Sequence, residues 1–498
     1  MYFSKKIYMT RKIKYILIML LTFIVYDSAA QNSQVLYYMN LPQRHFLNPA
    51  IRPSNSLYIG LPVISGVNVN VNNNFVNFSD VIMKNPSGDS LITILHPDYD
   101  ISRFVTKFKD VNAIEPEALV QLFGLGFNAG KDLYIFLDIN ERVDANVAIP
   151  GDLFRLAFQG NKQFAGNKID LSTLRGDVKE YREFGLGFSK NFTNKLRLGI
   201  KGKLLFGTAA ISIDNRALDI TVNDDYTHTL NADLMVNFSA PVNVYINADK
   251  NIDSLTFDDS RFNSTKGIID YLLKSSNMGL GLDIGAEYSF TSKLKVSAAI
   301  TDLGYIKWKR DLTNLRAESQ FTFSGIDLLK VYNGTMTFDS LGTEFLDSLK
   351  NSLFLTDTKI PFTTNLPFGV TFGGSYNLTK SISVGLLSYT RVIGKQLKEA
   401  LTLSANINFG NAFSTSFAYT AANNRYDNLG AGLAFRTGFF QFYFIADRIP
   451  VVWDKLVTDG STIPIPVSWN TVHLRLGMNL AFGNKLKKKD DKPMVLVQ

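Results

Sequence analysis

The sequence predicts an all-β fold, a transmembrane antiparallel β-barrel of about 14 strands with a few short helices. Three observations support this prediction: strand-length runs that alternate between apolar and polar residues, an N-terminal stretch typical of an export signal, and charges on the polar faces of the strands. The best runs are about ten residues long, which is enough for a tilted strand to cross a bilayer.

The clearest alternation lies in residues 401–409 and 472–482, near the C-terminus. In both runs every second residue is apolar, and most of the residues between them are polar. Side chains alternate between the two faces of a strand, so one face is apolar and the other is polar. Residues 280–289 repeat the pattern in mid-chain, with Asp283 and Glu287 on the polar face.

Alternation alone does not say which face points inward. The polar faces carry too many charges for a dry core, because an unpaired buried charge is costly. We therefore predict that the polar faces line a hydrated lumen and that the apolar faces contact outer-membrane lipid. The predicted lumen-facing residues are Arg197, Lys201, Lys203, Asp283, Glu287, Arg436 and Arg475.

The first 30 residues have the features of a secretory signal peptide. Basic residues precede an apolar run at 15–25, and the small residues Ser28, Ala29 and Ala30 follow it. We expect cleavage before Gln31 and residence in the bacterial outer membrane. The apolar run is too short for a transmembrane helix and no later run is longer, so any crossing must use strands.

The rest of the chain is predicted to form one architecture, with a barrel at residues 57–483 and a basic periplasmic tail at 484–498. A propeller would repeat every 40 to 50 residues or so, and a secreted sandwich of this length would divide into domains of about 100 residues. Neither pattern is present.

Residues 31–56 show no strand period and contain Asn48, Pro49 and Ala50. An Asn-Pro-Ala motif in an N-terminal segment ahead of a long barrel resembles the FadL-like outer-membrane transporters. In that family the segment is a hatch inside the barrel, so the resemblance implies a plug at 31–56, with the motif in the plug or at its hinge. A turn that Pro49 fixes is the simpler alternative.

Two further resemblances concern barrels of Bacteroidota. The Tyr-Met-Asn run at 38–40, followed by Asn-Pro-Ala, is similar to the opening of PorP/SprF-type barrels. Segments 149–153, 302–308 and 366–369 resemble an uncharacterised outer-membrane family.

These resemblances imply two functions. The FadL likeness implies a passive transporter of small, possibly hydrophobic compounds. The PorP/SprF likeness implies a non-enzymatic barrel that binds periplasmic or surface proteins in a secretion or gliding assembly.

We expect no enzyme, cofactor or metal. Residues 88–91 spell the nucleophile block of GDSL hydrolases, and Asp225 and His228 match the spacing of the other triad members in that family. Ser90 follows no buried strand, however, and no α/β alternation surrounds it, so we interpret the match as coincidence. The four histidines share no metal-ligand spacing, and the chain has no cysteine. Basic residues outside the tail are scattered, which argues against nucleic-acid binding.

Overall fold

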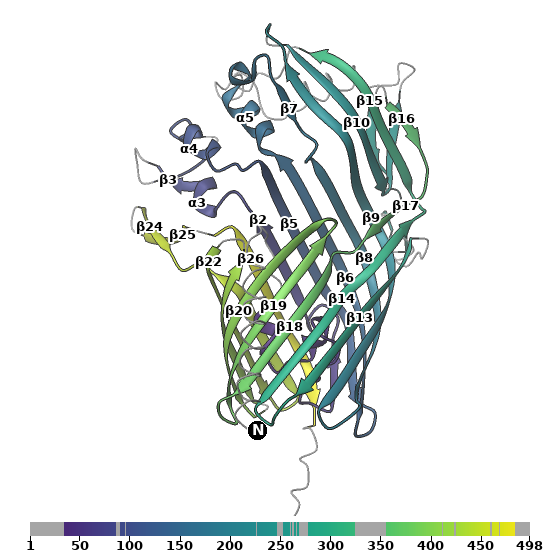
Figure 1. Cartoon of the computed structure of the whole chain (residues 1–498), viewed down its shortest axis with the longest axis vertical. Coiled ribbons are helices and arrows are strands. Elements are labelled where there is room, and N and C mark those ends of the chain that lie inside the picture. Colours follow the sequence, from purple (N-terminus) through teal and green to yellow (C-terminus); the bar gives the residue numbers. More distant parts are fainter. Residues whose placement is uncertain are drawn as a thin grey trace, which may run out of the picture.

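The alternating runs of the sequence form a closed barrel in the computed structural model (Figure 1). The structure describes residues 34–483, apart from 86–89, 95, 226, 247–251, 259, 261–262, 265, 268–276, 324–354, 411, 423–424, 459–460 and 468. The predicted signal peptide at 1–30 and the predicted basic tail at 484–498 lie outside the described residues, so both stay predictions.

The barrel closes between its first and last strands. The first strand has two segments, β1 (Leu57–Gly60) and β2 (Val67–Asn73), and both pair with β26 (Thr471–Phe482) and with β5 (Val111–Asn128). The other strands are β6 (Leu133–Pro150), β8 (Arg175–Asn191), β9 (Leu196–Val222), β13 (Met278–Ser289), β14 (Leu294–Trp308), β18 (Phe368–Asn377), β19 (Ile382–Ile393), β20 (Gln396–Phe409), β21 (Phe413–Ala422), β22 (Arg425–Thr437) and β23 (Phe440–Ile449). The prediction of an antiparallel barrel of 14 strands is confirmed.

The two faces of the wall differ in polarity, as the alternation predicts. On β20, Thr402 and Ser404 are buried in the interior, whereas Leu403 is 59% exposed on the outer face. Phe417 and Leu433, on the next two strands, are also about half exposed. A continuous outward band of large apolar side chains is the surface that a bilayer covers. No helix among the described residues is long and apolar enough to cross a membrane.

An outward-facing ion pair marks the upper edge of this band. Glu141 on β6 and Arg182 on β8 are register partners, and their carboxylate and guanidinium lie 2.6 Å apart. Below them on β8, Phe184, Leu186 and Phe188 are exposed. Charged groups avoid the hydrocarbon region, so the outer interface of the bilayer lies near this pair.

The two rims of the barrel differ in their connections. The turns at the lower rim of Figure 1 are short, for example 129–132 and 192–195, and the N-terminal segment joins β1 at this end, where the N–H of Ser56 donates to the carbonyl oxygen of Phe482. The long excursions leave from the upper rim. Short turns on one side and long loops on the other identify the lower rim as periplasmic and the upper rim as extracellular.

A sheet rises above one side of the barrel because β9 has 27 residues, more than a bilayer needs. Its lower part pairs with β13, and its upper part pairs with β10 (His228–Ser239). Figure 1 shows this sheet continuing upward. The elements that complete it are β7 (Lys168–Asp170), β15 (Leu312–Phe323) and β16 (Leu355–Thr358), while β17 (Phe362–Asn365) pairs with β14.

The remaining elements are short helices and hairpins at the extracellular end. The helices are α3 (Phe78–Val81), α4 (Ile101–Val105), α5 (Gly151–Gln159) and the 3-10 turn η2 (Lys162–Phe164). The hairpins are β3 (Ile82–Lys84) with β4 (Leu91–Thr93), β11 (Val242–Ile246) with β12 (Ile252–Phe257), and β24 (Trp453–Thr458) with β25 (Ser461–Pro466). Phe108 stacks on Phe154 of α5 with ring centroids 4.1 Å apart, which holds part of this region together.

Candidate functional site

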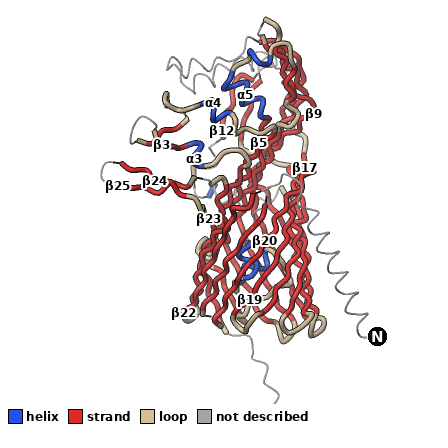
Figure 2. Tube along the Cα trace, turned by 60° about the vertical axis from the view of Figure 1, so that its left-hand side comes forward, coloured by secondary structure: helices blue, strands red, loops and turns tan. Residues whose placement is uncertain are grey.

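The N-terminal segment lies inside the lower half of the barrel (Figure 2). It contains the helix α2 (Gln34–Tyr38) and the 3-10 turn η1 (Pro42–Phe46). The side chains of Val35, Leu36 and Met39 are fully buried and pack with inward-facing residues of the wall. The lumen at this level is therefore closed by residues of the chain itself.

The Asn-Pro-Ala motif docks on two glycines of the wall. Asn48 is fully buried, and its Nδ2 donates to the carbonyl oxygens of Ala286 and Ala298 at 3.4 and 3.3 Å. A Cβ on Gly199 of β9 would lie 2.3 Å from the backbone of Pro49 and Ala50, and one on Gly285 of β13 would lie 2.1 Å from Asn48 Oδ1. Only glycine permits so close an approach.

Gly199 and Gly285 are register partners, and we call this pair the glycine seat. Further inward-facing glycines accommodate the rest of the segment in the same way. A Cβ on Gly373 or Gly385 would meet the rings of Tyr37 or Tyr38, and one on Gly430 or Gly432 would meet Val35 or Met39. Sequence reasoning missed this surface, although glycine at lumen-facing strand positions was a readable signal.

Side chains provide the polar contacts between the segment and the wall. His45 Nε2 lies 2.9 Å from Asp138 of β6, and both side chains are almost fully buried. Gln43 Nε2 donates to Asn479 Oδ1 of β26 at 2.7 Å. Asp447 accepts the backbone N–H of Val35 at 2.7 Å. Among the described residues, no backbone-to-backbone hydrogen bond joins residues 34–55 to a strand.

Above the N-terminal segment, charged side chains form a continuous network. Lys201 joins two carboxylates, with Nζ 3.1 Å from Asp138 and 2.8 Å from Glu183. Glu183 also contacts Arg142 at 2.9 Å. The network continues through Asp302, which contacts Arg142 at 2.7 Å and Lys203 at 2.5 Å, to Asp283, 2.7 Å from Lys203. Such pairs offset the cost of burying each charge.

Asp302 enters the lumen through an irregularity of β14. The register of β13 and β14 shifts between Leu282 and Ile284, and Asp302 has a φ of +63°. Non-glycine residues rarely adopt this conformation, and a bulge turns a side chain away from the regular alternation. The backbone N–H of Asp302 donates to Asp283 Oδ1 at 2.7 Å, which stabilises the bulge.

A second group of ion pairs crosses the lumen near its upper end. Arg391 of β19 contacts Glu117 of β5 and, at 2.8 Å, Asp144 of β6, while Lys398 of β20 contacts Glu115 of β5. β19 and β20 lie on the opposite side of the barrel from β5 and β6 in the strand order. These pairs, which we call the cross-lumen pairs, therefore join facing walls and constrict the lumen.

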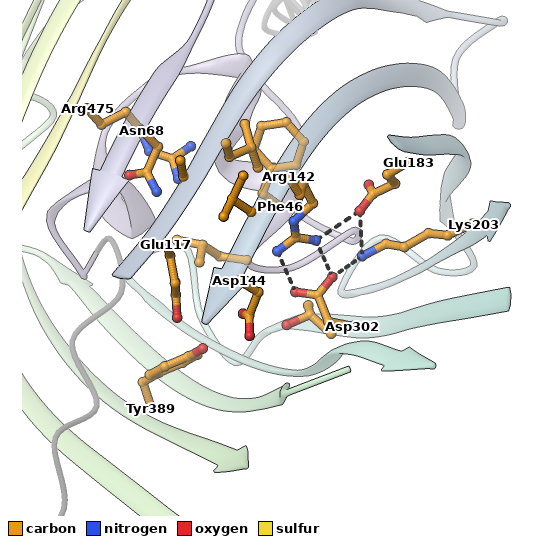
Figure 3. Close-up of a pocket in the computed structure, with 15 residues that line it drawn as sticks. Phe46, Asn68, Glu117, Arg142, Asp144, Glu183, Lys203, Asp302, Tyr389 and Arg475 are labelled. Carbon is orange, nitrogen blue, oxygen red and sulfur yellow. Dashed lines mark hydrogen bonds and ion pairs between the residues drawn. The ribbon is translucent and has the colours of Figure 1, made fainter. Parts of the chain in front are cut away.

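Between the cross-lumen pairs and the N-terminal segment lies a cavity of about 40 Å³ (Figure 3). A water needs roughly 10–15 Å³ on this measure, so the cavity holds only a few waters. Its lining is mainly polar and charged. The lining includes Phe46, Asn68, Glu117, Arg142, Asp144, Glu183, Lys203, Asp302, Tyr389 and Arg475.

The structure distributes the predicted lumen residues over three places. Lys201, Lys203 and Asp283 belong to the charged network, and Arg475 lines the cavity. Arg197 and Glu287 form a separate pair at 3.0 Å nearer the periplasmic rim. Arg436 is the last residue but one of β22, and its Nε donates to the carbonyl oxygen of Gly438 at 2.9 Å. Its place in the lumen stays a prediction.

The residues that match the GDSL pattern are engaged locally. Thr227 donates to Asp225 Oδ1 through its backbone N–H at 3.0 Å and its hydroxyl at 2.7 Å, and these bonds lower the pKa of Asp225. Ser90 lies in the turn between β3 and β4, where Asn85 Nδ2 approaches its hydroxyl at 3.4 Å. Gly88 and Asp89 lie outside the described residues.

A closed wall with an apolar outer band, a polar interior and a lumen-filling N-terminal segment defines the class, an outer-membrane β-barrel. The family model for a family of unknown function (DUF5723) matches residues 49–447, so the chain belongs to that family. A comparison with curated proteins found no match.

Solved structures of similar architecture include barrels of the FadL type. The toluene transporter TbuX of Ralstonia pickettii is 9% identical, with 89% of this chain and 94% of that chain covered and a TM-score of 0.41. A FadL homologue of Pseudomonas aeruginosa is 10% identical over 90% and 95% of the two chains, with a TM-score of 0.40. The Pseudomonas putida toluene transporter TodX is 7% identical over 91% and 93%, with a TM-score of 0.36. Sequence identities and TM-scores this low assign no substrate to this chain.

Proposed function

We propose that this protein is a passive outer-membrane transporter of small polar compounds and that residues 31–56 are its plug. The observation that carries the proposal is the way the N-terminal segment is held. It fills the lumen, yet its contacts with the wall run through side chains and close packing rather than through strand pairing.

A segment held in this way can move while the barrel stays intact. The hydrogen bonds that close the wall join strand to strand, including the closing pair of β26 with the first strand. Moving the plug breaks individual side-chain hydrogen bonds, each worth about 1 kcal/mol net and about 1.5–3 kcal/mol when charged. A ligand or partner that moves the plug must supply the sum of these costs, and that of the buried apolar packing, through differential binding.

The lining of the cavity favours polar solutes over the hydrophobic compounds that the FadL resemblance implied. A hydrophobic compound in this cavity would desolvate the carboxylates and cations around it without replacing their water. A polar solute can offer them hydrogen bonds. The same charges would keep the lumen hydrated if the plug left it.

Liposome swelling of the purified barrel tests the plug. We expect deletion of residues 31–53 to increase the swelling rate with small uncharged solutes such as glycerol and arabinose, relative to the full-length mature chain. Heat-modifiable gel mobility must first show that the deleted barrel is folded. A folded deletion variant that swells at the full-length rate would contradict a role for this segment in closing the lumen.

The sheet above the barrel supports a second candidate, a barrel that binds a protein partner in an assembly. β10, β15 and the upper part of β9 extend beyond the band that lipid covers, which is more structure than a pore requires. Crosslinking in intact cells followed by affinity purification tests it. Recovery of a stoichiometric partner would favour this function, whereas recovery of the barrel alone together with plug-dependent swelling would favour transport.

A further inference from the structure

Arg475 is a buried cation that forms no ion pair with a carboxylate of the described residues. Its side chain is 4% exposed on the inner face of β26. Its Nε is buried and has no hydrogen-bond partner, and no carboxylate of the described residues lies within 4.0 Å of its guanidinium nitrogens. The ring of Phe46 lies 5.9 Å from its Cζ. A cation–π contact offsets only part of the several kcal/mol that burying a lone charge costs.

The other lumen cations near the cavity are all paired. Arg142 contacts Glu183 and Asp302, Lys203 contacts Asp283 and Asp302, and Arg391 contacts Asp144. Among the described cations that line the cavity, Arg475 is therefore the one without a carboxylate partner.

On the neighbouring strand β23, the carboxylate of Asp447 already has two partners. Asp447 accepts the N–H of Val35 at 2.7 Å, and its Oδ2 lies 2.5 Å from His473 Nδ1. Asn68, the register partner of Arg475 on β2, lies beside it on the cavity wall (Figure 3). Asn68 Oδ1 is 2.8 Å from His473 Nε2, a bond that fixes the orientation of the side-chain amide next to Arg475.

We propose that Arg475, with Asn68 beside it, is the binding position for a small monocarboxylate in the lumen. A guanidinium presents parallel N–H donors that match a planar carboxylate. The cavity of about 40 Å³ admits an anion about as large as acetate. Phe46 supplies an apolar surface for a short hydrocarbon body. This inference rests on the proposed transport and names the class of solute.

A monoanion fits this position better than phosphate does. Glu117, Asp144 and Asp302 line the same cavity. A dianion would be repelled by these carboxylates in a low-dielectric site, whereas a single negative charge is balanced by Arg475.

Thermal unfolding of the full-length mature protein in detergent tests the site. The probe is acetate, compared with the neutral analogue acetamide and with inorganic phosphate at constant ionic strength. We expect a saturable rise of the midpoint with acetate and none with acetamide. In Arg475→Gln the acetate concentration that gives half the rise should increase about tenfold or more, as loss of a charge-assisted pair requires. Arg475→Gln should also raise the midpoint without any anion, because an unneutralised buried charge is gone.

Arg182→Gln is the matched control, since Arg182 faces outward and contacts Glu141 rather than the lumen. It should keep the acetate response of the unmodified protein. An equal response to acetate and acetamide, or an unchanged response in Arg475→Gln, would overturn the site. A larger rise with phosphate than with acetate would overturn the choice of carboxylate.

The measurement separates this inference from the proposed transport because it does not depend on flux. Acetate binding through Arg475, combined with no swelling in the plug-deleted barrel, would overturn transport and leave the site standing. Plug-dependent swelling without an acetate response at Arg475 would overturn the carboxylate site and leave the proposed transport standing.

Discussion

The lumen is closed twice, and the two closures differ in chemistry. The lower closure is the N-terminal segment on the glycine seat, held by packing and by mostly neutral hydrogen bonds. The upper closure consists of the cross-lumen pairs, which are bonds between charges on facing walls. The lower closure adds residues to the lumen, whereas the upper one draws the walls themselves together. A change that loosens one should leave the other in place.

The largest expected effect comes from filling the glycine seat. Gly199→Val places carbon where the backbone of Pro49 and Ala50 now lies, so we expect the plug to be displaced and liposome swelling to rise several-fold toward the level of the plug deletion. Gly202→Val on the same strand is the control, since a Cβ there meets nothing within 4 Å. Equal swelling rates in the two folded variants would show that the seat does not hold the plug.

Removing one member of the cross-lumen pairs should have the next largest effect, measured on stability. Arg391→Gln removes the cation that joins Glu117 and Asp144, so we expect a loss of about 3–5 kcal/mol in the free energy of unfolding. Urea titration of the reconstituted barrel measures it. The triple variant Arg391→Met, Glu117→Leu and Asp144→Leu removes all three charges and should recover most of the loss. A loss that persists in the triple variant would point to packing instead of charge.

A smaller effect is expected at the polar contact between plug and wall. His45→Gln removes the imidazole contact with Asp138, but Lys201 still neutralises that carboxylate. We therefore expect the free energy of plug docking to fall by about 1–2 kcal/mol. The chain has no cysteine, so a single reporter, Ser54→Cys, can report plug exposure through its maleimide labelling rate. Labelling should accelerate in His45→Gln and stay unchanged in Arg391→Gln. Acceleration in both would show that the two closures are coupled.

The smallest effect is expected on the outer face. Glu141→Gln breaks the pair with Arg182 at the edge of the bilayer, where water screens the charges, so we expect at most about 1 kcal/mol. The urea titration used for Arg391→Gln measures both changes side by side. A loss as large as that of Arg391→Gln would mean that the outward pair is buried in lipid rather than at its edge.

Alternation in the sequence was sufficient to predict the barrel, its number of strands and the side on which Lys201, Lys203 and Asp283 lie. It could not predict the cross-lumen pairs, because Arg391 and Glu117 meet only when the closed wall brings opposite strands together. It placed Arg436 on the face of Ala434, but parity along a strand does not show that Arg436 is close to the end of β22. The position of Asp302 depends on a bulge that no period of two describes.

Asp138 and Glu183 were missed for a related reason. Both were readable as acids within apolar runs, but their significance depends on Lys201, which reaches them from a different hairpin. The glycines of the glycine seat were readable in the same way, but their role depends on the segment that packs on them. A glycine in a strand looks like a weakness until the backbone that approaches it is known.

The attachment of the plug restricts the order in which the molecule can assemble. Residues 34–55 lead directly into the first strand, and the backbone N–H of Ser56 donates to the carbonyl oxygen of Phe482, the last residue of the last strand. The seam between β26 and the first strand forms only after the whole chain has been made. The N-terminal segment must therefore wait throughout synthesis and either lie inside the curling sheet when the seam forms or thread in afterwards through the periplasmic rim.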